Sequence, residues 1–140
     1  MWIIYAVLSA SFAAAVAIFG KLGLKNLDVT LATTIRSIIM AIFLVATSLS
    51  FGKLANFSLT NLNQKEWWLI VASGVAGALS WLCYFLALKN GSATAVVAID
   101  RLSLVIVAIL ALLILKEPLS ARAWLGVVLM VGGAVLVSLK

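Results

Sequence analysis

The sequence has no histidine, one cysteine and one proline, and these shortages exclude several kinds of site. Without histidine, the chain has neither an imidazole proton relay nor the commonest ligand of a catalytic metal. Cys83 is alone in an apolar run, so we expect it to be a small packing residue rather than half of a disulfide or a paired nucleophile. No metal-ligand cluster or phosphate-cradling glycine loop occurs. We predict that the protein is not an enzyme and uses no cofactor or metal.

Charge is also scarce, because 10% of the 140 residues are charged whereas 66% are hydrophobic, and the mean hydropathy is +1.27. A soluble domain is nearer half apolar and a quarter charged. The net charge of +6 comes from single residues scattered between apolar runs, which makes no stripe for nucleic acid and suits contact with anionic lipid headgroups. These features predict an integral membrane protein.

Five apolar segments are long enough to cross a bilayer, which takes about 20 residues for a helix. Met1-Trp2 offers no basic region before the first segment, so we interpret it as a retained helix and not a signal peptide. Ser92 can cap the fourth helix, Pro118 cannot continue it, and Ser120 can start the fifth. Backbone groups in lipid need internal partners. We therefore predict an all-α bundle forming a single domain over residues 1–140. The predicted spans are residues 2–20, 29–51, 67–88, 92–115 and 120–139.

Three charged residues lie deep inside these spans, away from the ends: Arg36 in the second, and Asp100 with Arg101 in the fourth. A charge at the centre of a membrane helix costs about 2.5 to 3.5 kcal/mol, and the fourteen Val, Ile and Leu residues of the fourth span only roughly cancel two such costs. From the helical rise, Arg36 lies roughly 10 Å deep and Asp100 roughly 12 Å deep. An ionisable group at this depth is a candidate functional residue.

Only one of these three charges is acidic, so the two arginines compete for it. We hypothesise that Asp100 holds Arg36 bidentately. Arg101, which points about 100° away from Asp100 on a helix, would then be a spare guanidinium suited to a carboxylate or phosphate. The alternative is that all three charges only hold helices together.

Aromatic and hydroxyl side chains accompany this charged layer. One helix face carries Trp81, Tyr84, Phe85 and Leu88, which could line a cavity. The same spacing also fits an apolar stripe that packs between helices or faces lipid. Ser37 is a possible hydrogen-bond donor beside Arg36. The binding site that we predict comprises Arg36, Asp100, Arg101, Trp81, Tyr84 and Ser37.

Glycines near the carboxyl terminus give a packing signal rather than a chemical one. Gly126 and Gly133 are one heptad apart and Gly132 adjoins them, so another helix can approach closely. We predict that Gly126, Gly132 and Gly133 form a helix–helix or dimer seam.

The carboxyl-terminal half resembles the EamA domain of the drug/metabolite transporter superfamily. The resemblance rests on the following residues: Tyr84-x-x-Ala87-Leu88, Gly91-Ser92-Ala93, Leu102-Ser103, Lys116-Glu117-Pro118-Leu119-Ser120, Gly126 and Gly132-Gly133. The five-span layout extends it over nearly the whole chain. Family members typically carry two inverted five-helix repeats, and many export amino acids and other metabolites. The resemblance therefore implies that this chain supplies one repeat and that a second copy supplies the other.

Charge in the loops and at the ends of the spans agrees with an inverted pair, because each membrane face carries four cationic residues. One face has Lys53, Lys65, Lys116 and Arg122; the other has Lys21, Lys25, Lys89 and Lys140. The bias that normally sets orientation is thus absent, and both orientations can be populated unless another feature decides.

We therefore expect an antiparallel homodimer in the lipid bilayer, in a bacterial or archaeal inner membrane, that exports a small amphipathic metabolite, such as an amino acid, by alternating access. Two alternatives stay open. The chain could be a flippase subunit for a lipid carrier, or a membrane assembly subunit that transports nothing.

Overall fold

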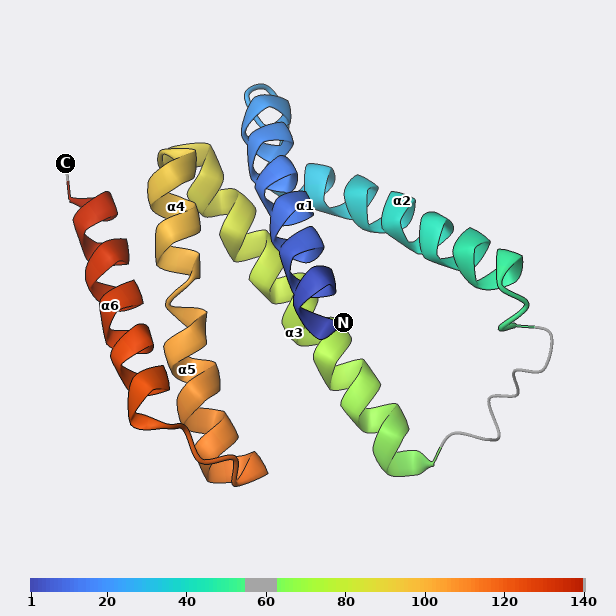
Figure 1. Ribbon diagram of the computed structural model, residues 1–140. Helices are drawn as coiled ribbons and strands as arrows, with labels where there is room; N and C mark the ends of the chain where they lie inside the picture. The colour runs from blue at the N-terminus through green and yellow to red at the C-terminus, as the bar shows by residue number, and fades with distance from the viewer. Residues whose placement is uncertain (55–62, 140) are drawn as a thin grey trace. The chain divides into compact units, whose positions relative to one another are not determined.

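The regular structure of the chain is helical throughout residues 1–54 and 63–139, which are the residues described by a computed structural model (Figure 1). Within them, five segments are long and apolar enough to cross a membrane, which confirms the predicted all-α membrane fold. Four spans are single helices: α1 (Trp2–Gly23), α2 (Val29–Ser50), α3 (Gln64–Asn90) and α6 (Ala121–Ser138). The fourth is divided into α4 (Ala93–Asp100), α5 (Ser103–Leu110) and a π-helix, η2 (Ala111–Leu115).

Most large apolar side chains of these helices are exposed in the single chain. Phe43 in α2 and Leu113 in η2, for example, are each 69% exposed. A soluble protein rarely leaves such extensive apolar surface uncovered. Lipid or another protein chain must therefore cover the outer faces of the helices.

The chain divides into two compact units. One comprises Met1–Lys21 with Asn90–Lys140, and the other is Leu22–Lys89. Most of the polar stretch that follows the second span falls in residues 55–62, which lie outside the described residues, as does Lys140, one of the cations counted above.

In the unit of residues 22–89, the buried side chains lie near the start of α2 and the end of α3. Val29 and Thr33 are buried in α2, as are Phe85 and Leu88 in α3. The Lys89 ammonium donates a hydrogen bond of 3.2 Å to the carbonyl of Leu27, which ties the end of α3 to the turn before α2. This end of the hairpin therefore contains its buried side chains.

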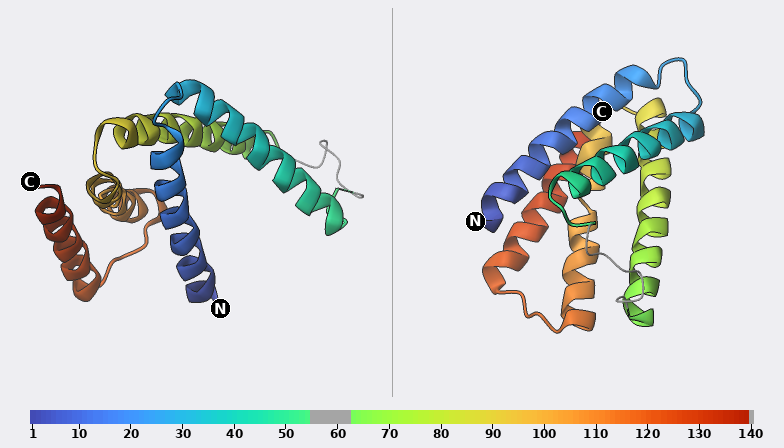
Figure 2. Two further views of the ribbon diagram at one scale, coloured as in Figure 1. Left: turned by 90° about the horizontal axis from the view of Figure 1, so that it is seen from above. Right: turned by 90° about the vertical axis from the view of Figure 1, so that its right-hand side faces the viewer.

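In the other unit, α4 and α6 lie side by side, while α5 contacts α6 over a shorter stretch (Figures 1 and 2). Val127 and Ala134 of α6 are buried, and Ala108 is buried in α5. The Lys21 ammonium, at the end of α1, donates a hydrogen bond of 2.7 Å to the carbonyl of Gly91 in the turn before α4. A cation near the last turn of a helix also complements the helix dipole.

The predicted start and stop signals of the last two spans are confirmed. Ser92 and Ser120 accept hydrogen bonds from the backbone N–H groups of Ala95 and Ala123, at 3.3 and 3.2 Å, and so cap α4 and α6. The fourth span ends at Lys116, which takes a left-handed conformation with φ 56°, while the N–H of Glu117 donates to the carbonyl of Ala111. This closure lets Pro118 follow without disturbing the helix.

Asp28 caps the start of α2, a role that was not predicted from the sequence. Its carboxylate accepts the N–H of Leu31 at 3.0 Å, which lowers the pKa of this carboxyl from its usual 3.8. The stability contributed by a carboxylate with a lowered pKa is complete above the unfolded pKa and is lost as pH falls through the folded one. Asp28→Ala should therefore lower the melting temperature in detergent by a few degrees at about pH 7, and the difference from wild type should shrink at about pH 3.

Asp28→Asn is the matched control, because asparagine caps helices without titrating. We expect it to melt close to wild type at neutral pH. An Ala variant that melts like wild type at neutral pH would show that the cap does not stabilise α2.

Candidate functional site

Arg36 lies in the second turn of α2 and is half-buried against aromatic rings of α3. Its Cζ atom is 3.6 Å from the centroid of the Trp81 ring and 5.4 Å from that of Phe85. A cation on an aromatic face gains about 0.5 to 2 kcal/mol, depending on desolvation. Because a deep membrane charge costs about 2.5 to 3.5 kcal/mol, the ring contact offsets only part of the cost of placing Arg36 there.

The aromatic face predicted on α3 is formed by mutual ring contacts. Trp81 meets Tyr84 edge to face, with centroids 5.5 Å apart, and Phe85 at 5.6 Å. Tyr84 and Phe85 are 6.0 Å apart. The structure thus brings together three predicted site residues, Arg36, Trp81 and Tyr84, and adds Phe85, which the spacing had placed on this face but which was not among the predicted site residues.

Ser37 uses its hydroxyl within its own helix. The Oγ atom donates a hydrogen bond of 2.8 Å to the carbonyl of Thr33, and the buried Thr33 hydroxyl donates to Val29 in the same way at 2.7 Å. Such bonds satisfy hydroxyl donors in an apolar setting. The hydroxyl proton of Ser37, predicted to be available as a donor, is thus used within α2, and its oxygen can still accept a hydrogen bond.

Asp100 and Arg101 lie where the fourth span is interrupted, and both are exposed in the single chain. Asp100 is the last residue of α4, and Arg101 and Leu102 form the turn that leads into α5 (Figure 1). Asp100 and Arg36 belong to different compact units, so their pairing stays a prediction.

The fourth span is interrupted because the backbone hydrogen bonds between α4 and α5 change their spacing. The N–H of Leu102 donates to Ile99, that of Leu104 to Arg101 and that of Val105 to Leu102, all three residues back rather than four. The carbonyls of Ala98 and Asp100 thereby lose their usual helical donors. Irregular backbone at membrane depth is tolerated only inside protein or beside a water-filled cavity. The turn therefore needs a polar neighbour.

The three glycines predicted to form a seam face open space in the single chain. A Cβ atom placed on Gly126, Gly132 or Gly133 would meet nothing within 4 Å. By contrast, Val127 and Ala134 of the same helix are buried. The role of the glycines in a seam with a second copy stays a prediction.

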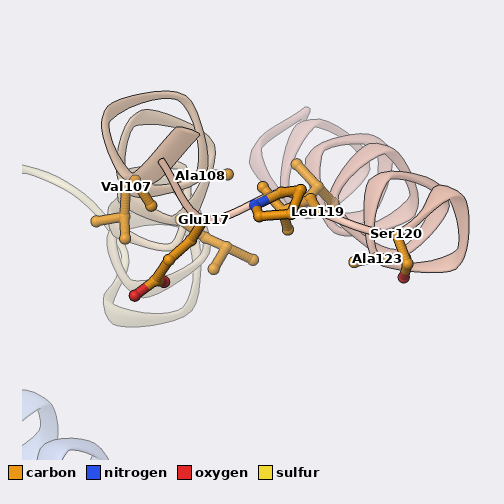
Figure 3. A pocket seen from close by; sticks show the side chains of 10 residues that line it. Val107, Ala108, Glu117, Leu119, Ser120 and Ala123 are labelled. Atoms are coloured by element: carbon orange, nitrogen blue, oxygen red, sulfur yellow. The ribbon is translucent and has the colours of Figure 1, made fainter. Parts of the chain in front are cut away.

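A pocket of about 330 Å³ lies between α5, η2 and α6, and none of the predicted site residues lines it (Figure 3). Its lining is mostly apolar, and the Glu117 carboxylate points away from Leu119 and Ser120. No group of three His, Cys, Asp or Glu side chains that could hold a metal ion occurs among the described residues. The pocket therefore offers no cluster for acid–base or metal chemistry.

The comparisons with known proteins concern the whole chain. A model of the EamA-like transporter family matches residues 1–139. A protein of Sinorhizobium sp described as an uncharacterized transporter in the cobO 3' region is 38% identical over 137 residues, which cover 98% of this chain and 96% of that protein. No solved structure matches the chain.

The change in backbone hydrogen bonding between α4 and α5 predicts faster exchange of the amides there. The amides between Asp100 and Val105 have shorter-range hydrogen bonds beside two charged side chains. In hydrogen–deuterium exchange, a peptide containing this turn should exchange faster than one from the middle of α6, which has an unbroken ladder. Equally slow exchange of the two peptides would show that α4 and α5 form one continuous helix in the protein.

Proposed function

We propose that this chain, which belongs to the EamA-like transporter family, exports a small amphipathic metabolite such as an amino acid. The family and the five apolar helices make it an integral membrane protein and a membrane transporter, and the inner membrane is consistent with both. The observation that carries the proposal is the presence of three charged side chains inside apolar spans. Such residues mark substrate and ion pathways.

The proposed binding site divides its roles by charge and shape. Arg36 and Asp100 shape the site, with their pairing as part of the proposal, and Arg101 meets an anionic group of the substrate. Trp81 and Tyr84 line the site and contact apolar parts of the substrate, while Ser37 accepts a hydrogen bond. Two features support this assignment: the Arg36–Trp81 contact and the interrupted helix beside Arg101. Discontinuous membrane helices recur at the binding sites of secondary transporters.

We further propose that the working unit is an antiparallel homodimer that operates by alternating access. One five-helix repeat, equal cationic charge on the two faces and the open surface at the α6 glycines support a second, inverted copy. Inversion would place the charged layers of the two copies on either side of the membrane midplane, where transporters built from repeats bind substrate.

The inverted dimer predicts that the carboxyl terminus is found on both sides of the membrane. Fusions of the chain to a reporter active only in the cytoplasm and to one active only outside it should both give signal. Adding lysines to one face should shift the ratio of the two signals, because cationic loops stay cytoplasmic. Signal from only one fusion would exclude dual insertion of identical chains.

The role of Arg101 predicts a loss of transport without a loss of protein. Arg101→Gln removes a charge-assisted contact to substrate, so uptake of labelled amino acids into inverted vesicles should fall about ten- to hundredfold. Arg122→Gln, on the exposed first turn of α6 at the very start of its span, is the matched control and should transport like wild type. Unchanged transport by the Arg101 variant would mean that its guanidinium only holds helices together.

A further inference from the structure

We infer that Arg36, held flat against Trp81, is the receptor for a planar carboxylate, so that the transported substrate is a carboxylic acid. This inference rests on the proposed function. A guanidinium has five N–H donors on more than one edge, so Arg36 can hold a substrate carboxylate on one edge while its proposed pairing with Asp100 uses another. It is carried by the geometry of the α2–α3 hairpin, which lies within one compact unit.

The distance between Arg36 and the indole fixes how the guanidinium is oriented. The Cζ atom of Arg36 is 3.6 Å from the centroid of the Trp81 ring. At this distance, a guanidinium standing on edge, with an N–H bond pointing at the ring, would bring that hydrogen too close to the ring atoms. The separation is that of two carbon atoms in van der Waals contact. The guanidinium therefore lies with its flat face on the indole, and the tilted Phe85 ring lies farther off, at 5.4 Å.

A guanidinium in this position keeps its hydrogen-bond donors for another partner. All five N–H groups lie in its plane, so a ring on its face uses none of them. Within the described part of Leu22–Lys89, no residue accepts a hydrogen bond from Arg36, and no buried side-chain nitrogen in the described chain is left without a partner. The donors are therefore open to the surroundings of the hairpin rather than sealed inside it.

The acids of the same unit are too far away or already engaged. Asp28 precedes Arg36 by eight residues, or about 12 Å of helix, and its carboxylate accepts the N–H of Leu31. Glu66 precedes Trp81 by fifteen residues, or about 22 Å, and accepts the N–H of Asn63. The described part of the hairpin thus holds a cation and supplies no anion for it.

A carboxylate is the anion that matches this arrangement. It is planar, and two parallel N–H···O bonds along the guanidinium edge fix its orientation while the ring fixes that of the guanidinium. Trp81, Tyr84 and Phe85 then present apolar surface close to the bound acid group, which suits the amphipathic substrate of the proposed function. A lysine at this position would keep the charge, but it could neither stack flat on the ring nor donate two parallel hydrogen bonds to a carboxylate.

The test measures binding by the purified full-length protein in detergent, which requires neither transport nor dual orientation. The probes are leucine, phenylalanine and benzoate, each with its amide and its phosphonate analogue. Wild type should bind at least one acid about tenfold or more tightly than its amide, because the amide loses the charge-assisted pair. The acid should also bind more tightly than the tetrahedral phosphonate.

Four variants test whether Arg36 and Trp81 cause the preference for acid over amide. Arg36→Lys and Trp81→Leu should reduce the ratio of acid to amide affinity toward one. Trp81→Phe, which keeps a ring beneath the cation, and Arg122→Lys, the same substitution at the start of α6, should preserve the ratio. Retention of the wild-type ratio in Arg36→Lys would overturn the inference, as would equal affinity of wild type for all acids and amides or binding of no acid.

A second measurement uses wild-type protein alone, in case a variant does not fold. Phenylglyoxal modifies arginine side chains, and the acid that binds should slow modification of Arg36 while leaving Arg122 unaffected. Unaltered modification of Arg36 at saturating acid would also overturn the inference. Acid binding through Arg36 in a protein that transports nothing would contradict the proposed function and leave the carboxylate receptor standing.

Discussion

The cost of holding a charge within lipid is the constraint on which the rest of this structure depends. Each of the three charged residues inside the spans needs a polar or aromatic neighbour, because no water is available in the bilayer core to solvate it. The hairpin of α2 and α3 gives Arg36 an aromatic face, which lowers the cost without removing the charge. Asp100 and Arg101 lie instead where the backbone itself is irregular. Both arrangements require polar surroundings that one exposed helix surface does not supply.

This requirement connects the local chemistry with the assembly that we propose. Apolar side chains cover the outer faces of the spans, yet the α6 glycines and the two charged residues at the α4–α5 turn are exposed as well. A second copy would cover small residues by close backbone approach and would enclose polar groups in a shared aqueous space. Exposed features of both kinds suit a protein partner better than lipid alone.

Much of the fold could be predicted from the sequence because lipid imposes simple rules. Span length, the caps at Ser92 and Ser120 and the stop at Pro118 follow from local chemistry, and the structure confirms them. The i, i+3, i+4 spacing placed Trp81, Tyr84 and Phe85 on one face, but which helix that face meets depends on tertiary packing. Contact with Arg36 could not be predicted from the spacing.

The division of the fourth span could not be predicted, since neither glycine nor proline marks it and its apolar residues continue on both sides. The adjacent acid and base were the only sign, and they predicted a costly helix rather than an interrupted one. The cap at Asp28 did have a signal in the sequence, because an aspartate stands directly before the β-branched residues that begin α2.

The interruption of the fourth span has a mechanical consequence. Each of α4 and α5 has eight residues, or about 12 Å of helix, which is less than half of a hydrocarbon core about 30 Å thick. A continuous rod transmits any tilt from one membrane surface to the other, whereas two short rods joined by a turn can tilt separately. Because α4 packs along α6 and α5 contacts α6 less, α5 together with η2 is less restrained than α4 and can tilt more easily. Movement at one surface can thus proceed while packing at the other is kept.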